Sequence, residues 1–192
     1  MDAKTLEKIK DYAKKEYGVS SDRQHNFDHV DRVAKNALKI VDALDVADKI
    51  DKNLLQAACY LHDIATSKSK SSNYFSQFLN HIFEKNINKR NILGILANFD
   101  LTWDDSQILL ASIINHSYSI PYRILNKQKD LYSQILQDAD SLDYAISNRE
   151  DSFLEGKGKI SVFLVRMYMN WIRNNIEKYL NFPELAEKIV VN

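Results

Sequence analysis

The stretch HNFDHVDRVAKNALKIVDAL, residues 25–44, decides the fold class of this chain. Its apolar residues recur at the i, i+3, i+4 and i+7 positions that form one face of an α-helix. These residues are Val30, Val33, Ala34, Ala37, Leu38, Val41 and Leu44. Asn26 is a suitable N-cap, and a cap there places His29 in the first turn. The stretch therefore predicts a helix over 28–44 that opens next to two histidines.

The same spacing recurs along the rest of the chain. It predicts further helices over about 4–17, 51–65, 73–86, 89–98, 104–117, 131–146 and 160–180, with a short helix after Pro183. The 192 residues include only four glycines and two prolines, although strands need turns that are rich in both. We predict an all-α fold, a single compact multi-helix domain over 1–192. Its motif-bearing core covers about 20–146, and helices at about 160–190 pack on that core.

The composition limits the classes of partner. Hydrophobic residues make up 45% of the chain, which argues against disorder. The 26 basic and 26 acidic residues balance, so bulk charge favours neither DNA nor an anionic membrane as a partner. Cys59 is the single cysteine and can form no internal disulfide, which points to a reducing compartment. We expect a cytoplasmic globular protein that has no membrane partner and no specific nucleic-acid partner.

Several polar residues interrupt helices that are otherwise apolar. His62 and Asp63 are adjacent in CYLHDIA, and adjacent residues diverge by about 100° around a helix. A structural core would gain little by burying both of them. Asp138, Asp140 and Asp143 likewise stand among apolar residues in ILQDADSLDYAI. Buried carboxylates are costly without a counter-charge, and a divalent cation is the simplest one.

The candidate donors form a mixed nitrogen and oxygen set. One helix opens with His29, another ends in His62 and Asp63, and a late helix carries Asp140. Two imidazoles and two carboxylates suit Mn²⁺, Fe²⁺, Co²⁺, Ni²⁺ or Zn²⁺ better than Ca²⁺, with Mg²⁺ possible, and the set lacks the thiolates of a structural zinc site. Four protein ligands leave room for water or phosphate oxygens on an octahedral ion. The pattern therefore predicts one divalent transition metal in a catalytic site.

Four segments in order resemble a known family. They are HNFDHVDRV at 25–33, AACYLHDIA at 57–65, ILLASIINHS at 108–117 and ILQDADSLD at 135–143. Together they resemble the HD-domain metal-dependent phosphohydrolase superfamily, and most closely its small stand-alone members. The resemblance implies that the metal ligands are His29, His62, Asp63 and Asp140. Asp140 is preferred to Asp138 and Asp143 because the family's ligand lies in the portion Ala139-Asp140-Ser141-Leu142.

The resemblance also implies a reaction. We expect the hydrolysis of a phosphate ester or anhydride of a nucleotide or another small phosphorylated metabolite. His25 and His116 would lie near the metal without binding it, and would donate hydrogen bonds or a proton, while Asp63 could also orient the attacking water. Arg32 could contact the substrate phosphate or pair with Asp28, and Lys68 could steer an anionic substrate.

The sequence departs from the family at two places. Ser141 stands where many relatives have arginine. The loop ATSKSKSSN, at 65–73, lacks the acidic pair found near the site in alarmone hydrolases of the superfamily, which argues against a guanosine-alarmone substrate.

Two alternatives stay open at the level of the sequence. One is a module of the same fold that senses a metal or a nucleotide without catalysis. The other is a two-metal enzyme, either a phosphodiesterase or a di-iron oxygenase, for which His81 and His116 could supply the two extra histidines.

Overall fold

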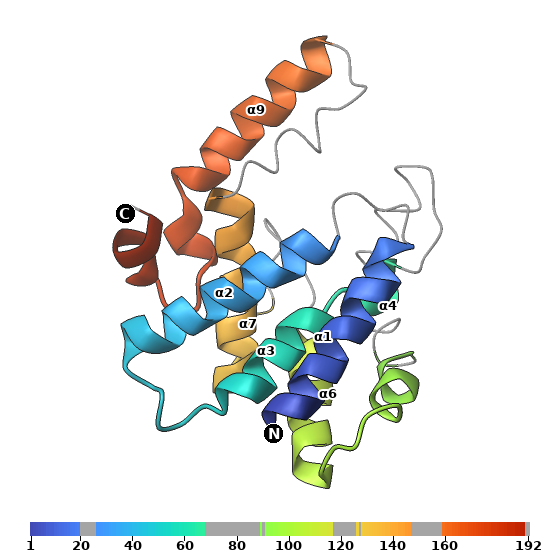
Figure 1. Ribbon diagram of the computed structural model, residues 1–192. Coiled ribbons are helices and arrows are strands. Elements are labelled where there is room, and N and C mark those ends of the chain that lie inside the picture. Colours follow the sequence, from blue (N-terminus) through green and yellow to red (C-terminus); the bar gives the residue numbers. More distant parts are fainter. Residues whose placement is uncertain are drawn as a thin grey trace.

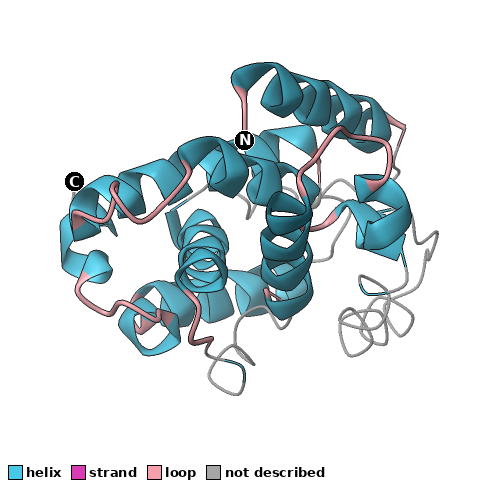
Figure 2. Ribbon diagram, turned by 90° about the horizontal axis from the view of Figure 1, so that it is seen from below, coloured by secondary structure: helices cyan, strands magenta, loops and turns pink. Residues whose placement is uncertain are grey.

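The computed structural model describes residues 1–19, 26–67, 89, 91–116, 126, 128–146 and 159–190. Every regular element within these ranges is helical and none is a strand, which confirms the predicted all-α fold (Figures 1 and 2). The helix predicted over 73–86 lies outside the described residues, as do His25, Lys68 and His81. No described helix has both the length and the apolar character that a bilayer crossing requires.

The helix α3, Lys52–Leu61, is the centre of the fold. Every residue from Leu54 to Leu61 except Gln56 is buried, and a helix that is apolar on all sides belongs in an interior. The helices packed against it include α1 (Ala3–Gly18), α2 (Phe27–Leu44), α6 (Trp103–Asn115) and α7 (Leu131–Ile146) (Figure 1). Asp51 caps α3, because its carboxylate accepts the backbone N–H groups of Asn53 and Leu54.

The helix α2 crosses α7 and also packs on α3 (Figure 1). Its buried face follows the predicted stripe with three exceptions. Ile40 is buried although it was not predicted to be, and Leu38 and Leu44 are only partly buried. The predicted cap is confirmed, because Asn26 Oδ1 accepts the backbone N–H of His29 at 2.9 Å. The cap fixes the first turn of α2, so His29 projects from a rigid position toward α3 and α7.

The run predicted as one helix over 51–65 is divided. Helix α3 ends at Leu61, and the short α4, Ile64–Ser67, begins after His62 and Asp63. The two polar residues therefore occupy a junction between helices. At this junction both side chains face the same buried point, with His62 Nε2 lying 3.1 Å from Asp63 Oδ2.

The carboxyl-terminal region is anchored by a buried carboxylate. Helix α9, Lys159–Arg173, gives way to a 3-10 turn at Ile176–Tyr179 and a π-helical turn at Ala186–Val190, where one run over 160–180 was predicted. Asp138 of α7 accepts the backbone N–H groups of Asn181 at 2.8 Å and Phe182 at 3.0 Å. Asp138 therefore binds the backbone of the carboxyl-terminal region. Residues two apart are separated by about 200° around a helix, so Asp138 and Asp140 lie on different sides of α7.

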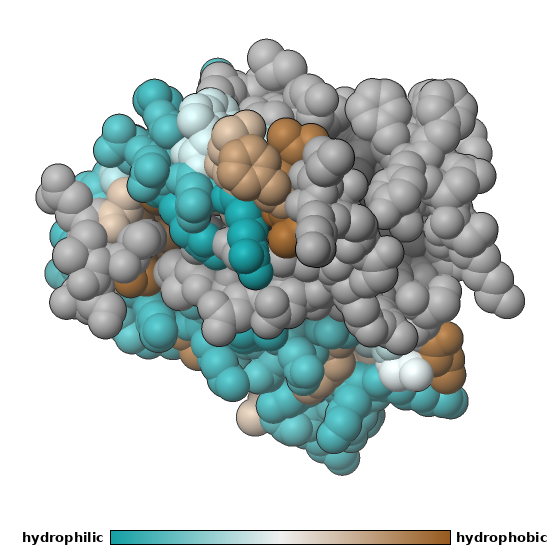
Figure 3. Space-filling model, turned by 90° about the horizontal axis from the view of Figure 1, so that it is seen from above, coloured by the Kyte–Doolittle hydropathy of each residue, from teal (hydrophilic) through white to brown (hydrophobic). Residues whose placement is uncertain are grey.

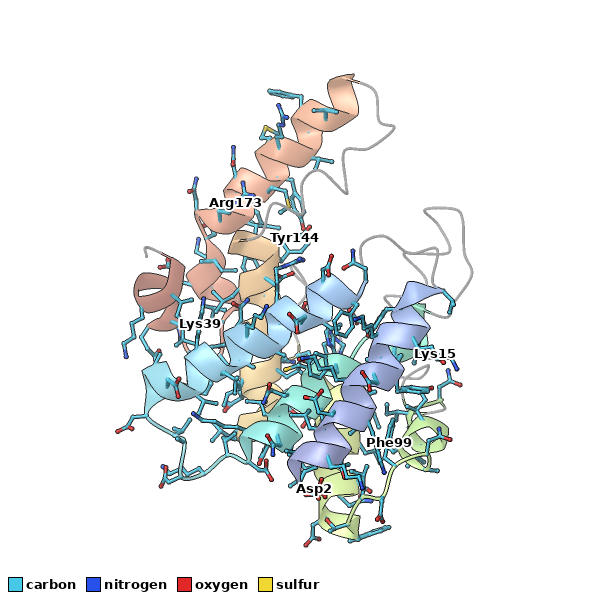
Figure 4. The ribbon with its side chains drawn as sticks, in the orientation of Figure 1. Asp2, Lys15, Lys39, Phe99, Tyr144 and Arg173 are labelled. Carbon is cyan, nitrogen blue, oxygen red and sulfur yellow. The ribbon has the colours of Figure 1, made fainter. Side chains whose placement is uncertain are left out.

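The described residues expose both charged and apolar side chains. Figure 4 shows Lys15 on α1 and Lys39 on α2 extending outward, and the ring of Phe99 packs edge-on against Tyr12 of α1. Figure 3 looks down on the end from which α9 projects, and it shows apolar side chains exposed between hydrophilic ones. Helix α9 exposes Phe163, Leu164, Met167 and Trp171.

The hydrogen bonds that Asp138 accepts from the backbone of Asn181 and Phe182 should contribute to stability. Asp138→Asn places an amide against two backbone donors, so we expect the free energy of unfolding to fall by about 2 kcal/mol. The control Asp42→Asn removes an exposed carboxylate that pairs only with Lys52 among the described residues, and it should cost less than about 0.5 kcal/mol. Urea unfolding of both variants measures the difference. Equal midpoints would contradict the anchoring role.

Candidate metal centre

Five polar side chains converge in the interior from different helices. His29 comes from the start of α2, His62 and Asp63 from the junction of α3 and α4, His116 from the end of α6, and Asp140 from α7. As whole residues, none of the five is more than 8% exposed, and the most exposed side chain among the four candidate ligands, that of Asp140, is 12% exposed. The structure therefore brings together the four side chains that the sequence proposed as ligands, with His116 beside them.

The donor atoms surround a common point. His29 Nε2 lies 3.4 Å from Asp63 Oδ2 and 3.5 Å from Asp140 Oδ1. His62 Nε2 lies 3.1 Å from Asp63 Oδ2. One donor atom from each of His29, His62 and Asp140 falls within 4.8 Å of the others. This spacing is that of ligands that could share one ion.

Hydrogen bonds to the far side of each imidazole set its orientation. Nδ1 of His62 lies 2.7 Å from the carbonyl oxygen of Cys59, and Nδ1 of His116 lies 3.2 Å from that of Ile113. Both rings stand at the carboxyl end of a helix, where the last carbonyls have no partner within the helix. A carbonyl only accepts, so Nδ1 carries the proton and Nε2 presents its lone pair to the cluster when the ring is neutral. Metal-binding histidines are held in this way.

The two carboxylates of the cluster favour the binding of a cation. Burial of the His62 ring opposes its charge, but the charges of Asp63 and Asp140 outweigh burial and raise the pKa of His62 to about 9. Nε2 of His62 is buried and has no well-aligned hydrogen bond in the described part of the chain, although Asp63 lies near it. Two carboxylates that face imidazole nitrogens need either protons or a metal between them. The residues present thus fit a divalent transition metal.

His116 lies at the edge of the cluster. Its Nε2 is 3.7 Å from Asp63 Oδ1, while the other oxygen of Asp63 faces His29 and His62. The rings of His62 and His116 meet edge to face, with centroids 4.7 Å apart. Donor atoms of His62, Asp63 and His116 also lie within 4.8 Å of one another. His116 can therefore reach a molecule that is hydrogen-bonded to Asp63. It could also serve as one ligand of a second ion site.

Arg32 pairs with a residue that the sequence did not suggest. Its Nε donates to Asp143 Oδ1 at 2.6 Å, whereas the sequence had suggested Asp28 or a substrate phosphate as its partner. The other oxygen of Asp143 lies 2.8 Å from Nδ1 of His29. A signal for this contact was present in the sequence: Asp143 follows Asp140 by three residues, so both occupy one face of α7. The Arg32 side chain remains 41% exposed.

Comparison with known proteins gives the family. Residues 26–145 match the family model of the HD domain, so the chain belongs to the HD-domain family, which forms a superfamily of metal-dependent hydrolases. A crystal structure of a Lactobacillus plantarum protein, solved by structural genomics, is similar with a TM-score of 0.58 and 17% sequence identity. The similarity covers 100% of this chain and 95% of that one, and it shows a shared fold. The comparison with curated proteins finds no match.

The raised pKa of His62 predicts how pH acts on the metal-free protein. The folded pKa of about 9 exceeds the ordinary value of 6.5, so the folded state holds the proton more tightly than the unfolded state. The resulting stability is complete below pH 6.5 and is lost as pH rises to about 9. We expect the melting temperature in a chelator to fall across this window, and to fall less in His62→Gln. Parallel curves for the two proteins would contradict the origin of the effect.

Proposed function

We propose that this chain is a metal-dependent phosphohydrolase that cleaves a phosphate ester or anhydride of a nucleotide or another small phosphorylated metabolite. The observation that carries the proposal is the convergence of two imidazole Nε2 atoms and two carboxylates at one buried point. Membership in the HD-domain family supports a hydrolytic, metal-dependent reaction. Phosphate is the proposed target because its oxygens suit the positions that four protein ligands leave open on the ion.

The proposed ligands are His29, His62, Asp63 and Asp140. They would hold one divalent ion, and their nitrogen and oxygen atoms suit Mn²⁺, Fe²⁺, Co²⁺, Ni²⁺ or Zn²⁺, with Mg²⁺ also able to bind. When bound, such an ion polarises a phosphoryl oxygen and makes a water acidic enough to attack near neutral pH.

Three residues are proposed to handle protons and developing charge. Asp63 can accept a hydrogen bond from the attacking water with the oxygen that faces His116. His116 lies 3.7 Å from that oxygen, and its Nδ1 is committed to the Ile113 carbonyl, so Nε2 is the atom available for proton transfer. His25 precedes the Asn26 cap directly, and its proposed role is a hydrogen bond to a phosphate oxygen.

Cationic side chains would attract the substrate. The two carboxylate ligands cancel the charge of a divalent ion, and the charges of Arg32 and Asp143 also cancel, so the site offers a phosphate little net positive charge. This supports a role for a further cation such as Lys68, which follows the HD junction along the chain. Arg32 keeps part of its side chain exposed, which supports a contact between its remaining N–H groups and the phosphate.

The proposed place of action is the cytoplasm. Cys59 is a buried free thiol, which suits a reducing compartment.

One observation favours a second candidate, a two-metal enzyme. The two oxygens of Asp63 face different histidines, as a carboxylate that bridges two ions would require. Elemental analysis distinguishes the two candidates, because the proposed site holds one ion per chain and the alternative holds two. A sensor that binds metal without turnover is the remaining alternative, and it is distinguished by the absence of phosphate release.

Asp63→Asn tests the proposed function directly. The variant keeps the shape of Asp63 but removes the charge, so we expect phosphate release to fall at least about 100-fold. The rise in melting temperature on adding Mn²⁺, which reflects preferential binding to the folded state, should shrink with it. The assay measures phosphate release from a panel of nucleotides and phosphomonoesters, with Asp42→Asn as the control. A wild type that binds metal and hydrolyses nothing in the panel would contradict phosphohydrolase activity.

His116→Ala separates a proton-transfer role from a ligand role. Removal of a general acid or base typically costs about 100-fold or more in turnover. Since His116 is not one of the four proposed ligands, the metal content should stay at one ion per chain. Turnover and elemental analysis are measured on the same preparation. A variant that loses metal would overturn this assignment in favour of the two-metal site.

A further inference from the structure

Asp143 is a buried carboxylate that touches the metal cluster through a histidine. It is 1% exposed and lies three residues after Asp140, on the same face of α7. Its Oδ2 lies 2.8 Å from Nδ1 of His29, and its Oδ1 accepts Nε–H of Arg32 at 2.6 Å. A second guanidinium nitrogen, Nη2, donates to Oδ2 at 3.3 Å. One carboxylate thus joins two residues of α2 to α7.

The position of His29 explains why a carboxylate is needed there. His62 and His116 stand at helix carboxyl ends, where Nδ1 faces the backbone carbonyls of Cys59 and Ile113. His29 stands in the first turn of α2, where the unpaired backbone groups are N–H donors. The first turn of a helix therefore offers its own histidine no unpaired carbonyl of the kind found at a carboxyl end, and an acceptor from another helix can take that place. Asp143 supplies that acceptor.

We infer that Asp143, held by Arg32, is the positioning residue that fixes the His29 imidazole with Nε2 toward the metal point. This inference rests on the proposed metal site. A carboxylate ion-paired with arginine only accepts hydrogen bonds, so the proton of the neutral His29 ring stays on Nδ1. The lone pair of Nε2 then faces Asp63 and Asp140, 3.4 Å and 3.5 Å away. Asp143 acts on the metal only through His29.

Arg32 completes the arrangement. The planar guanidinium engages both carboxylate oxygens, a geometry that the single ammonium of lysine does not reproduce. It also supplies the counter-charge that a buried carboxylate requires. Arg32 follows His29 by three residues, so the two side chains lie on the same face of α2 and reach the same partner.

A double-mutant cycle on zinc affinity tests the inference. Zn²⁺ is titrated into chelator-treated full-length protein against a competing chelator, with no phosphorylated substrate present. We expect Asp143→Asn to weaken Zn²⁺ binding about 10- to 100-fold, as the loss of a hydrogen-bond partner of a metal-binding histidine does. In a His29→Gln background the same change should alter affinity less than about twofold, because the residue through which it acts is gone.

The control and a second variant keep the result interpretable. Asp138→Asn removes another buried carboxylate of α7, and it should lower the melting temperature while it leaves Zn²⁺ affinity within about twofold. Arg32→Gln removes the guanidinium that holds Asp143 and leaves that carboxylate in place, and we expect about a tenfold loss of affinity that also vanishes in the His29→Gln background.

Two results would overturn the inference: unchanged Zn²⁺ affinity in Asp143→Asn, or an equal loss with and without His29. Either result leaves the hydrolase proposal standing, because no substrate is used. Conversely, a wild type that binds Zn²⁺ and shows the coupling, but releases no phosphate, would contradict the hydrolase proposal alone.

Discussion

The packing of the helices around the site depends on how the charge of two buried carboxylates, which face imidazole nitrogens, is neutralised. Asp63 and Asp140 are nearly inaccessible to water, and each lies within 3.5 Å of Nε2 of His29. Such an arrangement is unfavourable unless protons or a cation neutralise it. The raised pKa of His62 shows how the metal-free chain responds, by holding a proton on the ring. A divalent ion bound there would replace that proton, and its binding would then stabilise the folded state.

The polar side chains of the cluster can lie in an apolar interior because most of them stand at the ends of helices. The central helix α3 is buried along its length, and its last residues lead into the junction that holds His62 and Asp63. At the carboxyl ends of α3 and α6, backbone carbonyls contact Nδ1 of His62 and His116, whereas at the amino end of α2 the carboxylate of Asp143 contacts Nδ1 of His29. Regular helices supply the rigidity, and their ends supply the polar contacts that a helix interior would satisfy internally.

Periodicity and capping made much of this fold predictable. The apolar stripe of α2, the Asn26 cap and the polar pair at the end of α3 are local features, so the sequence alone indicates them. The partner of Asp138 is not local: Asn181 lies 43 residues away, and only the packed structure shows that its N–H groups supply the favourable contacts. The same holds for Arg32 and Asp143, which are 111 residues apart. The resemblance in sequence proposed the four candidate ligands, but it could not separate an aspartate that binds backbone N–H groups from one that contacts a histidine.

The central claim is that this cluster binds a divalent metal ion, and anomalous diffraction tests it most directly. Crystals of the full chain grown with excess Mn²⁺ are measured at a wavelength where manganese scatters anomalously. The account predicts an anomalous peak bounded by His29, His62, Asp63 and Asp140, within ligand distance of all four side chains. An ordered cluster without a peak between these side chains, in crystals saturated with Mn²⁺, would contradict it.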